Sequence, residues 1–138
     1  MKKVAKLILV NEDGKYLLLY RSNHPHFPYD PDLPGGTLEK DEKPDEALAR
    51  EIEEEIGIIL PIDSLKQLHQ SDSYDEGYLY YLFSSKITGK EEITISWEHS
   101  RYEWLNKKEF LMKSNFAIDK YMHMVNDYLK KNNFNHSK

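Results

Sequence analysis

The chain has 138 residues, no cysteine and a formal net charge of −5 at pH 7. This length suits one domain with a substantial core, and the lack of cysteine excludes disulfides and thiolate zinc sites. The negative charge argues against a general binder of nucleic acid polymers, because such affinity comes from Lys and Arg side chains that neutralise phosphates. A phosphate-bearing ligand would therefore need a cation or a local basic patch.

The N-terminal segment and the apolar runs carry no export or membrane signal. Residues 1–15 combine basic residues with an apolar run, but Lys6 interrupts that run and no small-residue cleavage site follows it. No apolar stretch approaches the length that spans a bilayer. We therefore expect one domain over residues 1–138, with a polar tail from about residue 132, in the cytoplasm and without membrane contact.

Two short apolar runs, Val4–Val10 and Lys15–Arg21, flank the sequence NEDG, which is typical of a hairpin turn. Their near-continuous apolar character predicts strands that are covered on both faces. The next segment, residues 22–36, contains four prolines, and this density excludes a helix or a central strand. We predict a long loop there, and long ordered loops in compact domains are often functional.

The second half of the chain alternates predicted helices and strands. A helix is predicted over Pro44–Ile56, because proline suits the first turn and Gly57 suits the position just after the last. A last amphipathic helix is predicted over Phe116–Lys131, where apolar residues recur at helical spacing. The remaining predictions are strands at 64–72, 78–87 and 92–97 and a short helix at 106–112.

The first of these helices carries four glutamates within five residues. At about 100° per residue, Glu51, Glu54 and Glu55 share one face beside the apolar stripe, whereas Glu53 points away. Like charges at this spacing destabilise a helix, so the cluster is either a solvated surface face or a site for a compensating cation. Carboxylates are hard oxygen donors and suit magnesium or manganese better than zinc.

The residues around this helix form a motif with fixed spacing. From Gly36 to Ile58 the sequence reads GTLEKDEKPDEALAREIEEEIGI. This run resembles the signature of the Nudix hydrolase family at every specified position. Seven fixed residues would match by chance very roughly once in 10⁸ starts. The positions that carry the match are Gly36, Glu42, Arg50, Glu51, Glu54, Glu55 and Gly57.

The resemblance implies a fold and a chemistry. The fold would be α+β, a three-layer α/β/α sandwich with a central mixed β-sheet in which the signature forms a loop–helix–loop. The reaction would be the hydrolysis of a nucleoside diphosphate linked to another group, with Mg²⁺ as cofactor and Mn²⁺ as a possible substitute. The partner would be a small nucleotide substrate rather than a nucleic acid polymer, and the enzyme a monomer or homodimer.

The resemblance also assigns roles to the acidic residues. Glu51, Glu54 and Glu55 would bind the metal. The backbone carbonyl of Gly35 would be a further ligand, because glycine lets the main chain approach an ion closely. Family members often supply an extra glutamate from a late loop, and here Glu98 is the first candidate as a metal ligand or general base, unless it is an ordinary loop carboxylate. Glu54 is the other candidate base.

Four other motif residues would support this arrangement. Arg50 would orient the glutamates by charge-assisted hydrogen bonds, and Glu42 would pair with Arg50. Gly36 begins the motif and Gly57 ends its helix, which are structural roles.

The choice of substrate depends on residues outside the motif. The compact chain resembles family members that hydrolyse nucleoside triphosphates, including oxidised ones, to monophosphate and pyrophosphate. Asn115 lies where that subgroup reads the base, although Asn115 or Ser114 could equally cap a helix. Tyr74 resembles a residue of dinucleoside-polyphosphate hydrolases, and no proline marks the ADP-ribose subgroup there.

Two alternatives remain at this stage. Arg21, together with His24 and His26, borders the proline loop and could contact phosphate or base, or could be an ordinary surface group. The domain could also be a Nudix-like binding module without catalysis, but such modules typically have a damaged glutamate set, and this set is complete.

Overall fold

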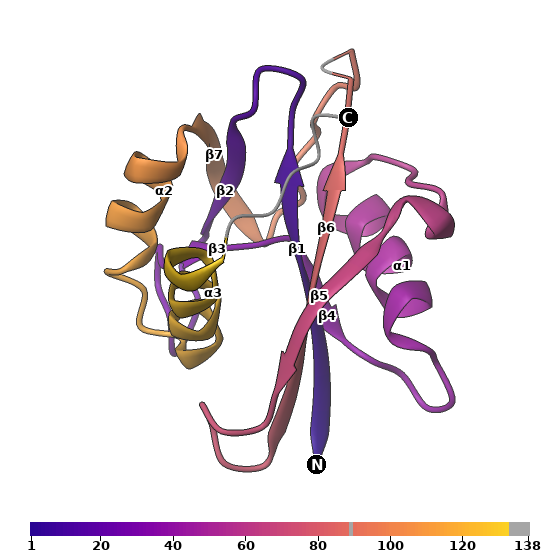
Figure 1. The fold of residues 1–138 in the computed structure, drawn as a ribbon, viewed down its shortest axis with the longest axis vertical. Coiled ribbons are helices and arrows are strands. Elements are labelled where there is room, and N and C mark those ends of the chain that lie inside the picture. Colours follow the sequence, from indigo (N-terminus) through magenta and orange to yellow (C-terminus); the bar gives the residue numbers. More distant parts are fainter. Residues whose placement is uncertain (89, 133–138) are drawn as a thin grey trace.

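The computed structural model describes residues 1–88 and 90–132, and its centre is a mixed β-sheet with helices on both faces (Figure 1). The path through the sheet runs β3-β2-β1-β6-β5, with β4 paired to β1 and β7 paired to β2. The strands are β1 (Lys2–Val10), β2 (Tyr16–Arg21), β3 (Pro31–Asp32), β4 (Gly35–Thr37), β5 (Lys66–Ser71), β6 (Tyr78–Lys86) and β7 (His99–Leu105). The helices are α1 (Pro44–Ile56), α2 (Lys107–Ser114) and α3 (Lys120–Lys131), with a 3₁₀ turn at Ile62–Ser64.

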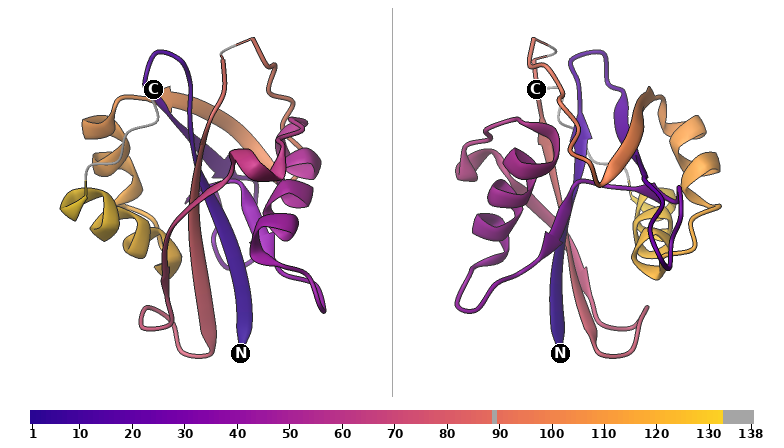
Figure 2. Two further views of the ribbon diagram at one scale, coloured as in Figure 1. Left: turned by 45° about the vertical axis from the view of Figure 1, so that its right-hand side comes forward. Right: turned by 180° about the vertical axis from the view of Figure 1, so that it is seen from behind.

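The helices form two outer layers. Helix α1 covers one face of the sheet, and α2 and α3 lie on the other (Figures 1 and 2). Strand β1 pairs in parallel with β6 and antiparallel with β2 and β4, so the sheet is mixed. The expected three-layer α/β/α arrangement is therefore confirmed. None of the helices in the described residues is long and apolar enough to cross a membrane.

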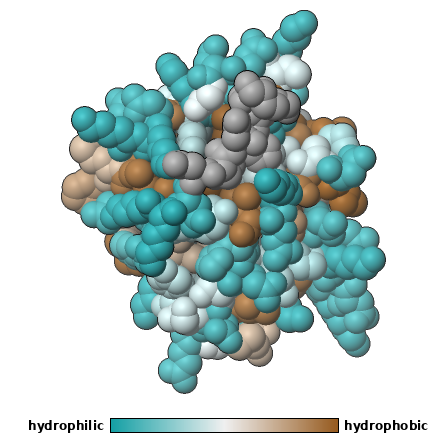
Figure 3. Space-filling view, viewed as in Figure 1, coloured by the Kyte–Doolittle hydropathy of each residue, from teal (hydrophilic) through white to brown (hydrophobic). Residues whose placement is uncertain are grey.

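The core is divided by β1 into two apolar clusters, one on each face. Ala5, Leu7 and Leu9 pack with the apolar side of α1, whereas Val4 and Ile8 pack towards α2 and α3. This alternation explains the near-continuous apolar run in the sequence and confirms that the strand is covered on both faces. The outer surface shown in Figure 3 is largely hydrophilic, with smaller apolar patches between the polar side chains.

Helix α1 has the bounds that its sequence predicts. Pro44 occupies the first turn, and Gly57 adopts a left-handed conformation with φ of 73°, from which its N–H donates to the carbonyl of Glu53. The predicted hairpin is also present, because β1 and β2 pair antiparallel with Val10 opposite Tyr16.

The prediction of a strand over 92–97 is wrong. The β-branched residues of this segment favour a strand, but its backbone donors serve the end of α1 instead. The N–H of Thr94 donates to the carbonyl of Ile56, and that of Ser96 donates to the carbonyl of Glu55, each at 3.0 Å. These bonds satisfy carbonyls that a helix end would otherwise leave free. The strand that follows, β7, was not predicted because charged residues interrupt its pattern.

The last helix and the proline loop also differ from the sequence prediction. The last helix begins at Lys120 rather than Phe116, because the Asp119 side chain caps it by accepting the N–H of Tyr121. The proline loop contains the short strands β3 and β4, whose pairing with β2 and β1 is set by distant residues. The polar tail expected beyond residue 132 lies outside the described residues.

A buried polar group joins the sheet to α3. Its centre is Asp32, whose Oδ1 lies 3.1 Å from Nζ of Lys6 and 3.2 Å from Nη2 of Arg21, while Oδ2 lies 2.8 Å from Nε2 of His99. The hydroxyl of Tyr121 also donates to Asp32. Burial alone would raise the pKa of Asp32, but Lys6, His99 and Arg21 together hold it well below its ordinary value. We call these five residues the Asp32 cluster.

The Asp32 cluster predicts a stability change. Replacing Asp32 by Asn should leave Lys6 and Arg21 without a full counter-charge and should lower the free energy of unfolding by about 3 kcal/mol. Urea unfolding at pH 7 measures this, with Asp13→Asn in the exposed hairpin turn as the control. A change below about 1 kcal/mol in Asp32→Asn would contradict the role given to this cluster.

Candidate functional site

The acidic face of α1 lies against β4. Glu55 is buried, with 6% of the residue exposed, and its Oε1 accepts the N–H of Gly35 at 2.7 Å. Glu51 lies beside Gly36, where an added Cβ would stand 2.6 Å from Cδ of the glutamate. At Gly35, with φ of 138°, an added Cβ would stand 2.1 Å from the carbonyl oxygen of Ala5. Gly36 therefore makes the space into which the Glu51 carboxylate fits, and Gly35 lets β4 lie close to β1 while its N–H reaches Glu55.

Two of the three carboxylates on this face, those of Glu51 and Glu55, are poorly solvated. Burial raises the pKa of Glu55 to about 8, although Lys6 and the Gly35 N–H favour the charged form. Burial also raises the pKa of Glu51, against the opposing effect of Arg50. Glu54 is the exposed member, with 59% of its side chain accessible. A positive charge at this face would therefore be favourable.

Arg50 holds the acidic face together. Its Nε and Nη2 donate to the two carboxylate oxygens of Glu42 at 2.8 and 2.9 Å. Its Nη1 lies 3.0 Å from Oε1 of Glu51 and 3.6 Å from Oε1 of Glu54. The hydrogen bonds from Arg50 lower the pKa of Glu42 to about 2. The bidentate pair with Glu42 thus fixes the guanidinium so that it orients Glu51.

The acidic face has hard oxygen donors, but its side chains are not gathered around one point. As the side chains lie, no three His, Asp or Glu side chains in the described part of the chain form a group that could hold an ion. Two of the three glutamates face Arg50 instead of one another. The donors are nevertheless hard oxygens, and the space beside Gly36 is open only because that residue lacks a Cβ. This chemistry fits a divalent cation such as Mg²⁺ or Mn²⁺.

A polar cavity of about 170 Å³ opens beside Glu55. It brings together Arg21, Gly35, Glu55 and Glu98, for which different roles were predicted. Glu98 is exposed, and its carbonyl accepts the N–H of Ser22 at 2.9 Å, so the late loop is tied to the proline loop. The lining residues are Lys6, Arg21, His24, Asp32, Gly35, Glu55, Glu98 and His99.

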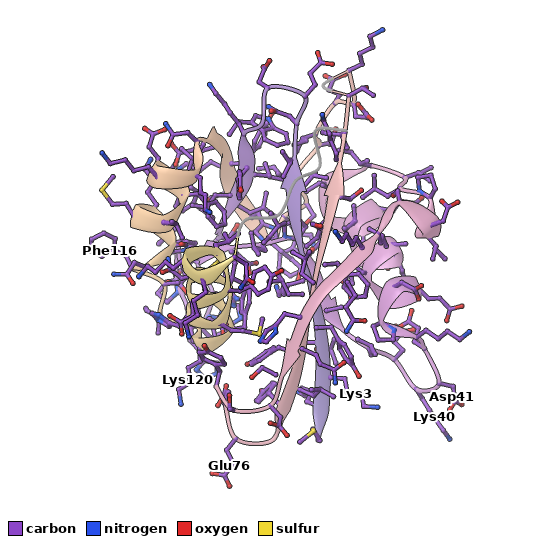
Figure 4. The ribbon with its side chains drawn as sticks, viewed as in Figure 1. Lys3, Lys40, Asp41, Glu76, Phe116 and Lys120 are labelled. Carbon is purple, nitrogen blue, oxygen red and sulfur yellow. The ribbon has the colours of Figure 1, made fainter. Side chains whose placement is uncertain are left out.

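Two residues named for substrate binding lie elsewhere. Tyr74 lines a separate cavity of about 340 Å³ beside α3, where its hydroxyl donates to Oδ2 of Asp127 at 2.6 Å. Asn115 is exposed and ends α2, with its N–H donating to the carbonyl of Leu111. The adjacent Phe116 points away from the body of the protein (Figure 4). The structure does not bring Tyr74 or Asn115 to the cavity beside Glu55.

Three lining residues were missed by the sequence analysis: Lys6, Asp32 and His99. The one signal for them was Lys6 itself, because a lysine inside a buried strand requires an acidic partner. Its partner is 26 residues away, and His99 is a further 67 residues beyond Asp32. Separations of this size give no periodic pattern in the sequence.

Relatives of this chain by sequence include a MutT-like protein and a nucleoside triphosphatase. The chain is 34% identical over 102 residues to a MutT-like protein of Streptomyces ambofaciens. The match covers 74% of this chain and 62% of that protein, so the chain spans less than two thirds of this relative. It is 30% identical over 115 residues to the nucleoside triphosphatase NudI of Salmonella arizonae, covering 75% of this chain and 82% of that one.

A solved structure of similar fold and a matching family model point to the same family as these relatives. The crystal structure of the MutT protein from Methanosarcina mazei has a TM-score of 0.72 at 24% identity and covers 94% of this chain and 91% of that one. The family model described as the NUDIX domain matches residues 2–124, which include the complete signature and the cavity beside Glu55. The chain therefore belongs to the Nudix family.

Proposed function

We propose that this protein is a metal-dependent hydrolase that cleaves nucleoside triphosphates, including oxidised ones, to monophosphate and pyrophosphate. The observation that carries the proposal is the packing of Glu51 and Glu55 against Gly35 and Gly36 beside a polar cavity. The likeness to relatives named MutT-like and nucleoside triphosphatase supports the choice of substrate.

The proposed metal ligands are the carboxylates of Glu51, Glu54 and Glu55 and the backbone carbonyl of Gly35. A bound Mg²⁺, or Mn²⁺ in its place, would neutralise the diphosphate, polarise phosphorus and lower the pKa of a bound water. Arg50 would then position the glutamates, as its contact with Glu51 allows. Because a divalent ion inverts the local charge, an acidic protein can bind an acidic substrate.

Glu98 is the proposed general base, and Glu54 is the alternative. Glu98 is exposed at the cavity that Glu55 and Gly35 also line, so its carboxylate is available to accept the proton of an attacking water. Glu54 is also exposed, but it is paired with Arg50 at 3.6 Å. Glu98 lines the cavity and Glu54 does not, which favours Glu98.

The substrate contacts proposed outside the metal site are Arg21 and Asn115. Arg21 lines the cavity and would contact phosphate, while its guanidinium is held by Asp32 and Asp119. Asn115 would read the base. Tyr74, beside a second cavity, would serve the alternative function, hydrolysis of dinucleoside polyphosphates, ADP-ribose or nucleotide sugars. A monomer or homodimer in the cytoplasm, acting on small nucleotides, stays a prediction.

The proposed substrate class is tested with a panel of nucleoside triphosphates, oxidised nucleotides, dinucleoside polyphosphates, ADP-ribose and nucleotide sugars in Mg²⁺. We expect nucleoside triphosphates or their oxidised forms to have the highest kcat/KM, with monophosphate and pyrophosphate identified by mass. A tenfold preference for a dinucleoside polyphosphate or ADP-ribose, about 1.4 kcal/mol in transition-state binding, would instead support the alternative. Binding without turnover would indicate a non-catalytic module.

The metal ligands are tested by replacing Glu54 or Glu55 with Gln. Turnover should fall by at least about a hundredfold, because the transition state depends on the ion more than the ground state does. In thermal melts, Mg²⁺ should stabilise the parent by RT ln(1 + [Mg²⁺]/Kd) and each variant by less. Glu53→Gln, on the opposite face of α1, is the matched control. Unaltered turnover in both variants would exclude the metal-site assignment.

The buried state of Glu55 predicts a pH dependence in protein stripped of metal by a chelator. Its folded pKa of about 8 lies above the ordinary value, so the protonated form is the one that folding favours. The parent and Glu55→Gln should therefore be about equally stable near pH 4.5. As pH rises to 8, the free energy of unfolding of the parent should drop below that of Glu55→Gln by more than about 1 kcal/mol. Urea unfolding across this range measures the difference, and a constant difference would disprove the prediction.

A further inference from the structure

His24 is a lining residue of the cavity to which neither the motif nor the proposed mechanism assigns a role. Its ring is fixed by its own loop. Nδ1 accepts the backbone N–H of His26 at 3.0 Å and that of Phe27 at 3.1 Å. The imidazole also stacks on the Phe27 ring, with centroids 5.4 Å apart and planes inclined by 28°. The side chain is thus held at two points before any ligand binds.

These contacts determine where the ring carries its proton. A ring nitrogen that accepts two N–H groups uses its lone pair and bears no hydrogen. The proton of His24 is therefore on Nε2, which takes no part in the turn. His24 lines the cavity together with Gly35 and Glu55, so its Nε2–H is the donor that the ring can offer to a ligand there.

The loop that carries His24 is itself anchored to the site. The guanidinium of Arg21 stacks on the Phe27 ring, 4.9 Å from its centroid. The hydroxyl of Ser22 donates to the carbonyl of Trp97 at 2.8 Å, and its N–H donates to the carbonyl of Glu98. The Nε2–H donor is thus positioned relative to Arg21 and Glu98 in advance, which reduces the ordering cost of binding.

With the proposed cation beside its carboxylates, the cavity that His24 lines suits phosphate oxygens. Apart from Gly35, every residue that lines it has a polar side chain, and its volume is about 170 Å³. A nucleobase is normally bound by apolar and aromatic walls. Anionic oxygens instead require donors such as the Nε2–H of His24 and the guanidinium of Arg21.

We propose that His24 is a substrate-binding residue whose Nε2–H donates to an oxygen of the diphosphate that becomes the pyrophosphate product. The proposal rests on the proposed function, since it takes Glu51, Glu54 and Glu55 as the site of the metal-bound substrate. It adds the chemical class of the group held in this cavity: a phosphate chain, rather than a base or a second nucleoside.

Two substitutions of His24 separate the roles of its two ring nitrogens. In His24→Asn, the side-chain oxygen replaces Nδ1 as acceptor in the turn, but the donor to the cavity is lost. In His24→Gln, the longer amide places a donor near the position of Nε2 but removes the turn acceptor. His26→Asn is the matched control, because His26 is an exposed histidine of the same loop that does not line the cavity.

The first readout is calorimetric binding of imidodiphosphate, a stable pyrophosphate analogue, in Mg²⁺. The parent should bind it, His24→Asn should bind about tenfold more weakly, and His24→Gln should recover to within about threefold of the parent. Thermal melts of His24→Asn and the His26→Asn control should match the parent. If the parent does not bind the analogue, if His24→Asn binds it as tightly, or if His26→Asn loses as much affinity, the proposal is wrong.

The second readout is turnover of the best nucleoside triphosphate. KM should rise with the loss of affinity in His24→Asn and recover in His24→Gln, because the lost hydrogen bond is made to the bound substrate. A parent that binds imidodiphosphate in the expected order of variants but cleaves no nucleotide would refute the proposed function alone. An unchanged KM in His24→Asn would refute the role of His24.

Discussion

The candidate site depends on one constraint, the burial of the Glu55 carboxylate against a glycine strand. The side chain enters the protein because α1 packs its apolar stripe on the sheet, and the neighbouring face then has to meet β4. Gly36 leaves room there for the Glu51 carboxylate, and Gly35 lets β4 approach β1 so that its N–H reaches Glu55. Burial destabilises the charged form of Glu55, whose carboxylate accepts the Gly35 N–H and whose pKa is raised. A cation would offset this cost.

The cavity contains two buried carboxylates in opposite electrostatic states. Asp32 is surrounded by Lys6, Arg21 and His99, which hold it charged and leave it little capacity for a further cation. The positive charge of Lys6 also lowers the pKa of Glu55, but without the close ion pair that Lys6 makes with Asp32. The difference assigns different tasks to the two groups: Asp32 joins strands and α3 into one scaffold, and Glu55 faces the ion. Arg50 gives Glu51 a neighbouring positive charge at 3.0 Å, but burial still raises the pKa of Glu51.

The sequence predicted the parts of this arrangement that are encoded locally. The spacing along α1 was enough to place Glu51, Glu54 and Glu55 on one face and to end the helix at Gly57, because helical periodicity is a short-range property. The pairing of Lys6 with Asp32 and the strand that starts at His99 could not be predicted in this way. Both depend on residues that are distant in the chain, and the polar pattern of β7 reflects its exposed face rather than its pairing.

The incorrect strand at 92–97 has the same physical origin. Its isoleucines pack on the α1 side of the core, as strand residues would, but its N–H groups of Thr94 and Ser96 bond to the last turn of α1. A pattern of apolar residues specifies which side chains are buried, and it does not specify the partner of the backbone. This segment nevertheless serves the site, because it leads directly into Glu98.

Direct measurement of manganese binding tests the central claim, that the glutamate face of α1 holds a divalent cation. Electron paramagnetic resonance of free Mn²⁺ gives the number of ions bound and their affinity without any substrate. The account predicts saturable binding in the parent and in Glu53→Gln, and at least about tenfold weaker binding in Glu55→Gln and in Glu51→Gln. Equal affinity in all four proteins, or no saturable binding to the parent, would contradict it.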